Sequence, residues 1–160
     1  MPFQVDEYIF DHLAALERMV GRALRSRLDP YDVRPGQIPV LRALQPTRTL
    51  SQKELLNTVP VEQPTLANTL RRMSRDGLIS SRRRQDDRRT VLYALTEKGL
   101  QAHGVASAAQ EDLRRVCEHG LTRNDLRYFR KILSQMTQHI EKDLNEPALF
   151  LADVVDTPRS

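Results

Sequence analysis

The sequence predicts a mainly α-helical fold with one small β-hairpin and a long helix towards each end of the chain. Three patterns support this prediction. Apolar residues recur at helical spacing over most of the chain. A polar, arginine-rich turn separates two short segments rich in β-branched and apolar residues. Capping residues and glycines mark the expected helix ends. With 160 residues, of which 39% are hydrophobic, the chain is long enough to bury its own core.

The first expected helix covers residues 6–28. Its apolar residues recur three or four positions apart, at Leu13, Leu16, Val20, Leu24 and Leu28. An Asp-Pro pair at residues 29–30 ends it. A second helix is expected over residues 35–44, since proline is a good first-turn residue. Pro39 should distort the beginning of this helix, because proline has no N–H to donate.

Two shorter helices joined by a tight turn are expected between residues 51 and 76. Ser51 and Glu54 form a capping box, which starts a helix of about eight residues. A Val-Pro-Val stretch at residues 59–61 ends that helix. The next helix has Pro64 in its first turn and ends before Gly77. This arrangement is the helix-turn-helix pattern.

A β-hairpin with a charged tip is expected next. Its strands cover residues 78–83 and 90–95, around a polar turn at residues 84–89. Eight arginines and three aspartates lie between residues 63 and 89, although the net charge of the whole chain is only +4. A local arginine patch on a nearly neutral body is typical of a protein that binds a polyanion. A solvated basic face without a partner is the alternative.

Two long helices complete the chain, over residues 96–118 and from a capping box at Thr122 and Asp125 to residue 145. The first and last helices carry apolar stripes that one small lobe cannot bury. These stripes consist of Leu13, Leu16, Val20, Leu133, Met136 and Ile140. Apolar surfaces of this size usually mark an interface, so we expect a homodimer.

This expectation divides the chain into two regions. Residues 1–30 and 97–160 form a helical dimerisation region, and residues 31–96 form a winged helix-turn-helix lobe. Neither internal repeats nor low-complexity tracts interrupt this division.

The helix expected over residues 63–76 has an apolar and a polar face. Leu66, Leu70 and Met73 share the buried face, because they lie at positions i, i+4 and i+7. The outward face carries short polar side chains followed by long cations. Such side chains can approach base edges in the major groove of DNA, while arginines reach guanine or phosphate. The expected DNA contacts of this helix are Gln63, Pro64, Thr65, Asn68, Thr69, Arg71, Arg72 and Arg75. An amphipathic surface helix without a partner is the alternative.

The hairpin tip offers a second contact with DNA. A guanidinium there can enter the narrow minor groove, and Arg89 is the first candidate. Asp87 lies two residues earlier and could hold Arg89 by a charge-assisted hydrogen bond. The expected contacts of the tip are Arg84, Asp87, Arg88 and Arg89. The alternative is an acid–base cluster that only keeps the hairpin soluble.

Three stretches of the sequence together resemble one family, the multiple antibiotic resistance regulator (MarR) family. Residues 62–79, EQPTLANTLRRMSRDGLI, resemble its recognition helix. Residues 87–99, DRRTVLYALTEKG, resemble its wing signature of Asp-x-Arg followed by Leu-Thr and a glycine. Residues 35–41 resemble its second helix, and the resemblance extends over residues 8–143. It implies a triangular homodimer whose terminal helices interlace, and a transcriptional repressor that binds palindromic double-stranded DNA.

The resemblance also implies a small effector, often a phenolic compound or another aromatic acid, bound between the dimer helices and the lobe. For an anionic aromatic ligand, His12 and Arg18 are candidate anchors, although a surface or interface role is the alternative for each. Redox-sensing relatives use a cysteine in the first helix, and this chain has none there. Its single cysteine, Cys117, is expected to be a packed structural thiol.

Other functions find less support in the sequence. A metal sensor would combine Cys117 and His119 with His12, His103 or His139, but no spacing gives a compact four-ligand site. An enzyme would need a nucleophile–base set, paired carboxylates or a phosphate-binding glycine loop, and none is evident. We therefore expect no catalytic site, no cofactor and no metal.

A non-specific architectural or RNA-binding winged helix remains a second hypothesis, which uniform, salt-driven binding to any duplex would favour. The lone cysteine and the lack of a signal peptide or an 18-residue apolar run predict a cytoplasmic protein without membrane contact.

Overall fold

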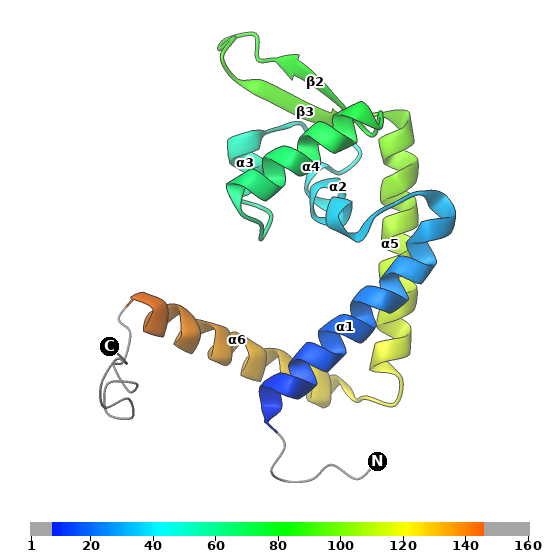
Figure 1. Ribbon diagram of the computed structural model, residues 1–160, viewed down its shortest axis with the longest axis vertical. Helices are drawn as coiled ribbons and strands as arrows, with labels where there is room; N and C mark the ends of the chain where they lie inside the picture. Colours follow the sequence, from blue (N-terminus) through cyan, green and yellow to red (C-terminus); the bar gives the residue numbers. More distant parts are fainter. Residues whose placement is uncertain (1–7, 146–160) are drawn as a thin grey trace, which may run out of the picture. The chain divides into compact units, whose positions relative to one another are not determined.

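The structure of the protein is a computed structural model, and it describes residues 8–145. The elements in chain order are α1 (Ile9–Leu28), α2 (Ile38–Leu44), β1 (Leu50–Ser51), α3 (Gln52–Leu56), α4 (Gln63–Arg75), β2 (Ile79–Arg83), β3 (Val91–Leu95), α5 (Glu97–Glu118) and α6 (Arg123–Asn145) (Figure 1). The described chain falls into two units that meet between Cys117 and Glu118, and each is described by itself. The predicted class, a mainly helical fold with a β-hairpin, is confirmed.

The start of the second predicted helix is distorted, as Pro39 suggested. The expected single helix over residues 35–44 is divided into a 3-10 turn at Pro35–Gln37 and the α-helix α2. Pro39 lies in the first turn of α2, where its missing N–H costs little. A further 3-10 turn at Asp29–Tyr31 follows α1, so the break expected at the Asp-Pro pair is present.

The capping box of α3 forms as predicted, but the helix is shorter than predicted. The backbone N–H of Ser51 donates to Glu54 Oε2 at 2.7 Å, and the N–H of Glu54 donates to Ser51 Oγ at 3.3 Å. The helix contains five residues rather than about eight. Pro60 cannot donate a hydrogen bond to the carbonyl of Leu56, so the helical ladder cannot continue through the Val-Pro-Val stretch.

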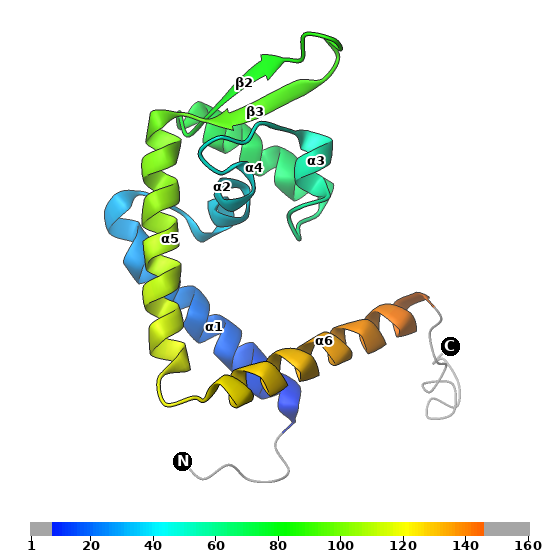
Figure 2. The same ribbon diagram turned by 180° about the vertical axis from the view of Figure 1, so that it is seen from behind.

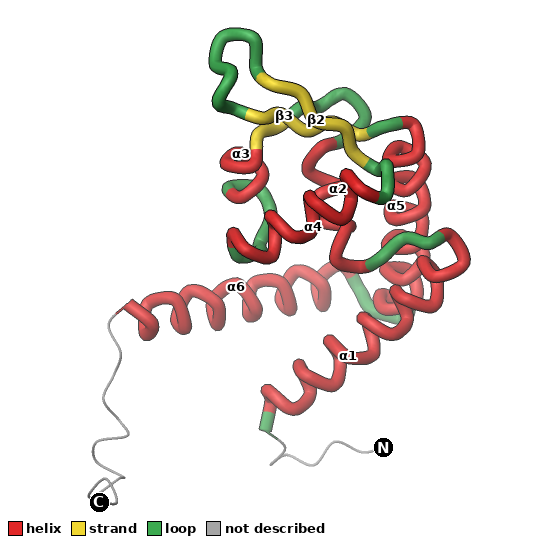
Figure 3. The backbone as a smooth tube through the Cα atoms, turned by 45° about the horizontal axis from the view of Figure 1, so that its top comes forward, coloured by secondary structure: helices red, strands yellow, loops and turns green. Residues whose placement is uncertain are grey.

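The predicted hairpin belongs to a three-stranded antiparallel sheet with strand order β1-β3-β2. β2 and β3 pair from Ile79↔Leu95 to Arg83↔Val91, and their hairpin is visible as the two long yellow segments of Figure 3. The two-residue strand β1 was not predicted. It pairs through Leu50↔Tyr93 with the edge of β3 that is opposite β2. Because β1 leads directly into α3, this pairing ties the middle of β3 to the helix-turn-helix.

One hydrophobic core joins the lobe to α1 and α5. Leu66, Leu70 and Met73 of α4 are buried, as their spacing predicted. Leu28 at the end of α1 belongs to the same cluster. So does a stripe of alanines on α5, at Ala102, Ala106 and Ala109. Their small side chains allow α5 to approach the lobe closely, and Figure 2 shows α5 running down from the end of β3.

Most of α1 is not buried in the single chain, as expected of an apolar stripe that one lobe cannot cover. Leu28 is fully buried, whereas Leu16 is 46% exposed and Met19 is 68% exposed. Arg27 fixes the C-terminal part of α1 to α5, because its Nε donates to Asp112 Oδ2 at 2.7 Å.

The second unit contains α6. Its predicted capping box forms, with the Thr122 N–H donating to Asp125 Oδ2 at 2.8 Å and the Asp125 N–H donating to Thr122 Oγ1 at 3.2 Å. These hydrogen bonds hold the pKa of Asp125 below its usual value. None of the residues of α6 is buried in the single chain. Within residues 8–145, no helix has the length and apolar character needed to cross a bilayer.

Candidate nucleic-acid interface

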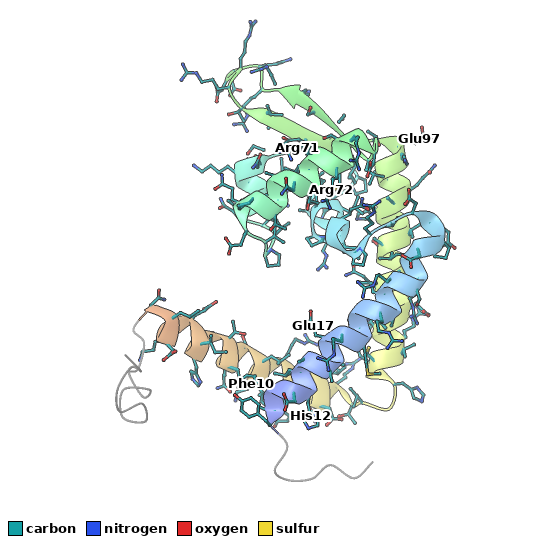
Figure 4. All side chains as sticks on the ribbon, viewed as in Figure 1. Phe10, His12, Glu17, Arg71, Arg72 and Glu97 are labelled. Atoms are coloured by element: carbon teal, nitrogen blue, oxygen red, sulfur yellow. The ribbon has the colours of Figure 1, made fainter. Side chains whose placement is uncertain are left out.

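The polar face of α4 is fixed by the packing of its opposite face. Since Leu66, Leu70 and Met73 are buried, the helix can present only the remaining positions to solvent. Seven of the eight predicted contact residues of α4 are exposed, namely Gln63, Pro64, Thr65, Asn68, Arg71, Arg72 and Arg75, and Thr69 is half-buried. Figure 4 shows Arg71 and Arg72 on this helix. We call these eight residues the α4 face.

Two arginines of α4 are held by short-range hydrogen bonds. Arg71 Nη1 donates to Asn68 Oδ1 at 2.8 Å, and Arg75 Nε donates to Asp76 Oδ1 at 3.0 Å. The first of these bonds occupies the side-chain oxygen of Asn68. The side-chain NH2 group of Asn68 is then the part that can donate to another partner. The sequence placed Asn68 and Arg71 three residues apart on a helix but did not predict this pairing.

The two ends of α4 differ in how their terminal backbone groups are capped. Glu62, the N-cap residue, makes no side-chain capping bond, so the first-turn N–H groups are not occupied by a cap. At the other end, Gly77 adopts a left-handed φ of 74°. The N–H of Leu78 donates to the carbonyl of Met73 at 2.9 Å, and that of Gly77 donates to Ser74 at 3.1 Å. This pair of bonds is the Schellman motif, which satisfies the last carbonyls of the helix.

Asp87 organises the backbone of the hairpin tip. Its Oδ1 accepts from the backbone N–H of Arg89 at 3.0 Å, and its Oδ2 accepts from Thr90 Oγ1 at 2.6 Å. These two hydrogen bonds, together with the charge of Arg84, lower the pKa of Asp87. The predicted charge-assisted hydrogen bond between Asp87 and Arg89 is present, and it holds Arg89 through its main-chain N–H.

The arginines of the tip have different surroundings. Arg88 and Arg89 are exposed. Arg84 is half-buried, with Nη2 at 3.9 Å from Glu54 Oε1 and Nε at 3.8 Å from Asp86 Oδ1. Arg84 therefore has an acidic neighbour in the capping box of α3 as well as one at the tip, and its side chain is 40% exposed. The pKa of Glu54 is lowered first by its hydrogen bonds from Ser51 and then by Arg84.

The structure adds Arg82 and Arg83 to the candidate interface. Both are exposed on β2, and Arg83 Nη1 donates to the carbonyl of Arg88 at 2.7 Å across the hairpin. Both belong to the arginine patch of the sequence, but they were not among the predicted contact residues. The signal available in the sequence was that both lie in an expected strand, directly before the predicted contact residue Arg84.

The predicted effector anchors lie on α1. His12 is half-buried and Arg18 is exposed, and neither lines a described cavity of the single chain. Their role in ligand binding stays a prediction. Cys117 is exposed rather than packed, because the buried stripe of α5 ends at Leu113. Among residues 8–145, no three His, Cys, Asp or Glu side chains gather in a way that could hold a metal ion.

Comparison with known proteins agrees with this geometry. The model of the MarR family matches residues 33–91. The chain is 27% identical over 94 residues to YwoH, an uncharacterized HTH-type transcriptional regulator of Bacillus subtilis, covering 59% of this chain and 68% of that protein. It is 32% identical over 87 residues to the organic hydroperoxide resistance transcriptional regulator of the same organism, covering 54% and 59% of the two chains.

Solved structures share the fold. BpsR of Bordetella bronchiseptica, whose DNA binding is regulated by 6-hydroxynicotinic acid, superposes with a TM-score of 0.73 at 19% identity, over 86% of this chain and 98% of that one. A MarR variant of E. coli complexed with operator DNA superposes with a TM-score of 0.71 at 21% identity, over 80% and 92% of the two chains. At these identities the superpositions establish the fold alone.

Proposed function

Because the chain belongs to the MarR family of winged-helix, non-enzymatic transcriptional regulators, we propose that it is a repressor that binds a palindromic operator as a homodimer. We further propose that a small aromatic acid modulates its affinity for DNA. This function implies a cytoplasmic location. The observation that carries the proposal is the exposed α4 face beside an arginine-rich hairpin tip.

The α4 face is suited to the major groove of DNA. Its exposed N-terminal half carries Thr65 and Asn68, whose short polar side chains can reach base edges. Arg72 and Arg75 in its C-terminal half are long enough to reach the phosphates beside the groove. The exposed Arg89 at the hairpin tip is the candidate for the adjacent minor groove. In a two-fold dimer, two α4 faces would meet half-sites about 34 Å apart.

Apolar side chains exposed in the single chain support the proposed dimer. On α1 these are Ile9, Phe10, Leu16 and Met19, and on α6 they are Tyr128, Phe129, Ile132, Ile140 and Leu144. Burial of such residues between two chains would remove a large apolar area from water. Ile132→Glu should convert a dimer in sedimentation velocity into a monomer, whereas Ser134→Glu on the same helix tests the effect of charge alone. A monomeric wild-type protein at micromolar concentration would contradict the dimer.

Selection from a random duplex library tests sequence-specific binding. We expect the wild-type protein to enrich one palindromic sequence. Asn68→Ala should lower affinity for the selected duplex by about 1–3 kcal/mol and relax the preference at one position of each half-site. Equal losses on selected and random duplexes would contradict base recognition by Asn68, and enrichment of no sequence would favour an architectural protein instead.

Salt dependence separates the role of the hairpin tip from that of α4. Arg89→Ala should weaken binding to selected and random duplexes alike and lower the slope of log K against log salt by about 1, because one phosphate contact or minor-groove contact is lost. Arg22→Ala, an exposed arginine of α1, is the matched control and should leave the slope unchanged.

The effector proposal rests on the likeness to BpsR and on the cations available. His12 and Arg18 remain the anchors predicted from the sequence. A small cavity in the first unit offers another place for an anionic ring, and its lining includes Tyr31, Arg34, Asp76, Lys98, Gln101 and Val105. Thermal-shift titration with 6-hydroxynicotinic acid, on the wild type and on Arg18→Ala and Arg34→Ala, would tell which cation binds it. No shift for the wild type would count against this class of ligand.

A further inference from the structure

The first turn of α5 is bonded directly to the C-terminal end of α4. Lys98 Nζ donates to the carbonyl of Asp76 at 2.8 Å. Thr96 Oγ1 donates to the carbonyl of Gly77 at 2.6 Å, and the backbone N–H of Thr96 donates to that of Leu78 at 3.1 Å. Three successive carbonyls after α4 therefore accept hydrogen bonds from two residues at the start of α5.

Thr96 also starts α5 itself. Its Oγ1 accepts from the backbone N–H of Gly99 at 3.0 Å, which is the bond expected of an N-cap residue. The same hydroxyl thus caps one helix and donates to the loop that follows the other. Any rotation of the Thr96 side chain away from this position would disturb both helix ends together.

Gly99 permits the close approach on which these bonds depend. It is buried, and a Cβ atom added to it would overlap the carbonyl oxygen of Leu78. That Cβ would also lie 3.3 Å from Leu95 Cδ2. Only a residue without a side chain lets the backbone of α5 come this near to the loop after α4.

These bonds act just beyond the C-terminal end of α4, which lies two residues after the last buried side chain of its apolar face, Met73. The buried side chains fix which face of α4 turns outward, but a helix held by one stripe can still tilt along it. Lys98 adds a positive charge at the negative, C-terminal end of the helix dipole. The described structure has no side-chain cap at the opposite end of α4. These hydrogen bonds therefore restrain the C-terminal end of α4 in addition to the packing of its buried side chains.

We propose that Thr96, Lys98 and Gly99 form a clamp that fixes the direction of α4, and that they are positioning residues for DNA recognition. This inference rests on the proposed DNA-binding function. The clamp lowers the freedom of the α4 face to adapt to unrelated duplexes, so it contributes to discrimination between sequences. Its loss lowers specificity without removing a phosphate contact.

Two conservative variants test the clamp, with a neighbour as control. Lys98→Met keeps the aliphatic stem and removes the donor, and Thr96→Val keeps the shape and removes the hydroxyl. Glu97→Gln changes a charge in the same turn, at a residue labelled in Figure 4 whose side chain is exposed. Lys98→Arg restores a donor and should rescue the Lys98→Met variant in part.

The first readout needs no DNA. In hydrogen–deuterium exchange, Lys98→Met and Thr96→Val should speed exchange of the amides of residues 76–78, which close the end of α4, while Glu97→Gln leaves them slow. Unchanged exchange in both variants would overturn the clamp, whatever the protein does with DNA.

The second readout is the ratio of affinities for the duplex selected by the wild type and for a random duplex. We expect Lys98→Met to lower this ratio about tenfold, the effect of losing one charged hydrogen bond, with an unchanged salt slope. An unchanged ratio would refute the positioning role. Equal losses of affinity on both duplexes, with a salt slope reduced by about 1, would also refute it, because this is the pattern of a lost phosphate contact. A wild type that selects no duplex would refute DNA recognition itself, and the exchange experiment would still decide the clamp.

Discussion

The substitution Gly99→Ala should destabilise the protein although alanine is the better helix former. The new Cβ would overlap the Leu78 carbonyl oxygen and lie 3.0 Å from the carbonyl carbon. This carbonyl cannot move away freely, because it accepts from the N–H and the hydroxyl of Thr96, each at 3.1 Å. Overpacking of this kind costs about 1–3 kcal/mol, and each strained hydrogen bond adds about 1 kcal/mol. The helix propensity of alanine offsets only about 0.5–1 kcal/mol.

We therefore expect a net loss of about 2–4 kcal/mol in the free energy of unfolding, measured by urea denaturation at a fixed protein concentration. Gly104→Ala is the matched control on the same helix. A Cβ at Gly104 would meet nothing within 4 Å, so this variant should gain about 0.5–1 kcal/mol. If both variants became more stable, the close approach of α5 to the loop after α4 would be refuted.

Three further predictions concern the core, a helix cap and acid stability. Leu66→Ala should cost about 2–5 kcal/mol by urea denaturation because Leu66 is fully buried, whereas Leu144→Ala, at a position 75% exposed, should cost far less. Ser51→Ala should cost about 1 kcal/mol through loss of the α3 capping box, and the exposed Ser80→Ala should be neutral in the same assay.

The third prediction concerns Glu111. Hydrogen bonds from Arg114 and Arg115 in the following turn lower the pKa of Glu111 to about 2. A carboxyl group with a lowered pKa contributes stability above its unfolded pKa near 4.5 and loses this contribution as the pH falls towards 2. Glu111→Gln should therefore show a flatter decline of stability between pH 4.5 and 2 in circular dichroism, and an unchanged decline would contradict the ion pairs.

The sequence predicts most of α4 because its signals are local. The spacing of Leu66, Leu70 and Met73 determines the buried face, and a helix that turns 100° per residue then has no choice about which side chains face outward. Pro64 and Gly77 mark its ends for reasons of backbone geometry that hold in any context. The outward residues could be predicted for the same reason.

The strand β1 and the length of α3 could not be predicted in this way. Two residues give no alternating pattern, and Leu50 pairs with Tyr93 across 43 positions of sequence. Such a pairing depends on the assembled hairpin, which local propensity does not describe. The capping box marked the beginning of α3 correctly, but after Leu56 the N–H of Thr58 donates to the carbonyl of Leu55, three residues back, at 2.9 Å, so the α-helical pattern ends there.

The role of Asp87 shows a different limit. Its distance of two residues from Arg89 was sufficient to predict that the two would interact. Arg89 offers both a backbone N–H and a guanidinium, however, and sequence spacing does not distinguish them. The turn decides the matter, because Thr90 returns its N–H to the carbonyl of Asp87 at 3.0 Å and so brings the backbone of Arg89 to the carboxylate. The conformation of the hairpin tip, and not an ion pair with Asp87, then sets the direction of the Arg89 guanidinium.

These local arrangements explain how one lobe can hold the two elements proposed to contact DNA in a constant relation. β3 pairs with β2 at the tip and leads through Thr96 into α5, while the loop after α4 leads into β2. The α4 face and the hairpin tip therefore share the junction at residues 76–78, which the start of α5 clamps. A displacement of α5 would move both elements together, so the proposed contacts of α4 in the major groove and of Arg89 in the minor groove would lose their register with DNA at the same time. Loosening the junction alone would separate them, which is why we expect the clamp variants to lose discrimination before they lose affinity.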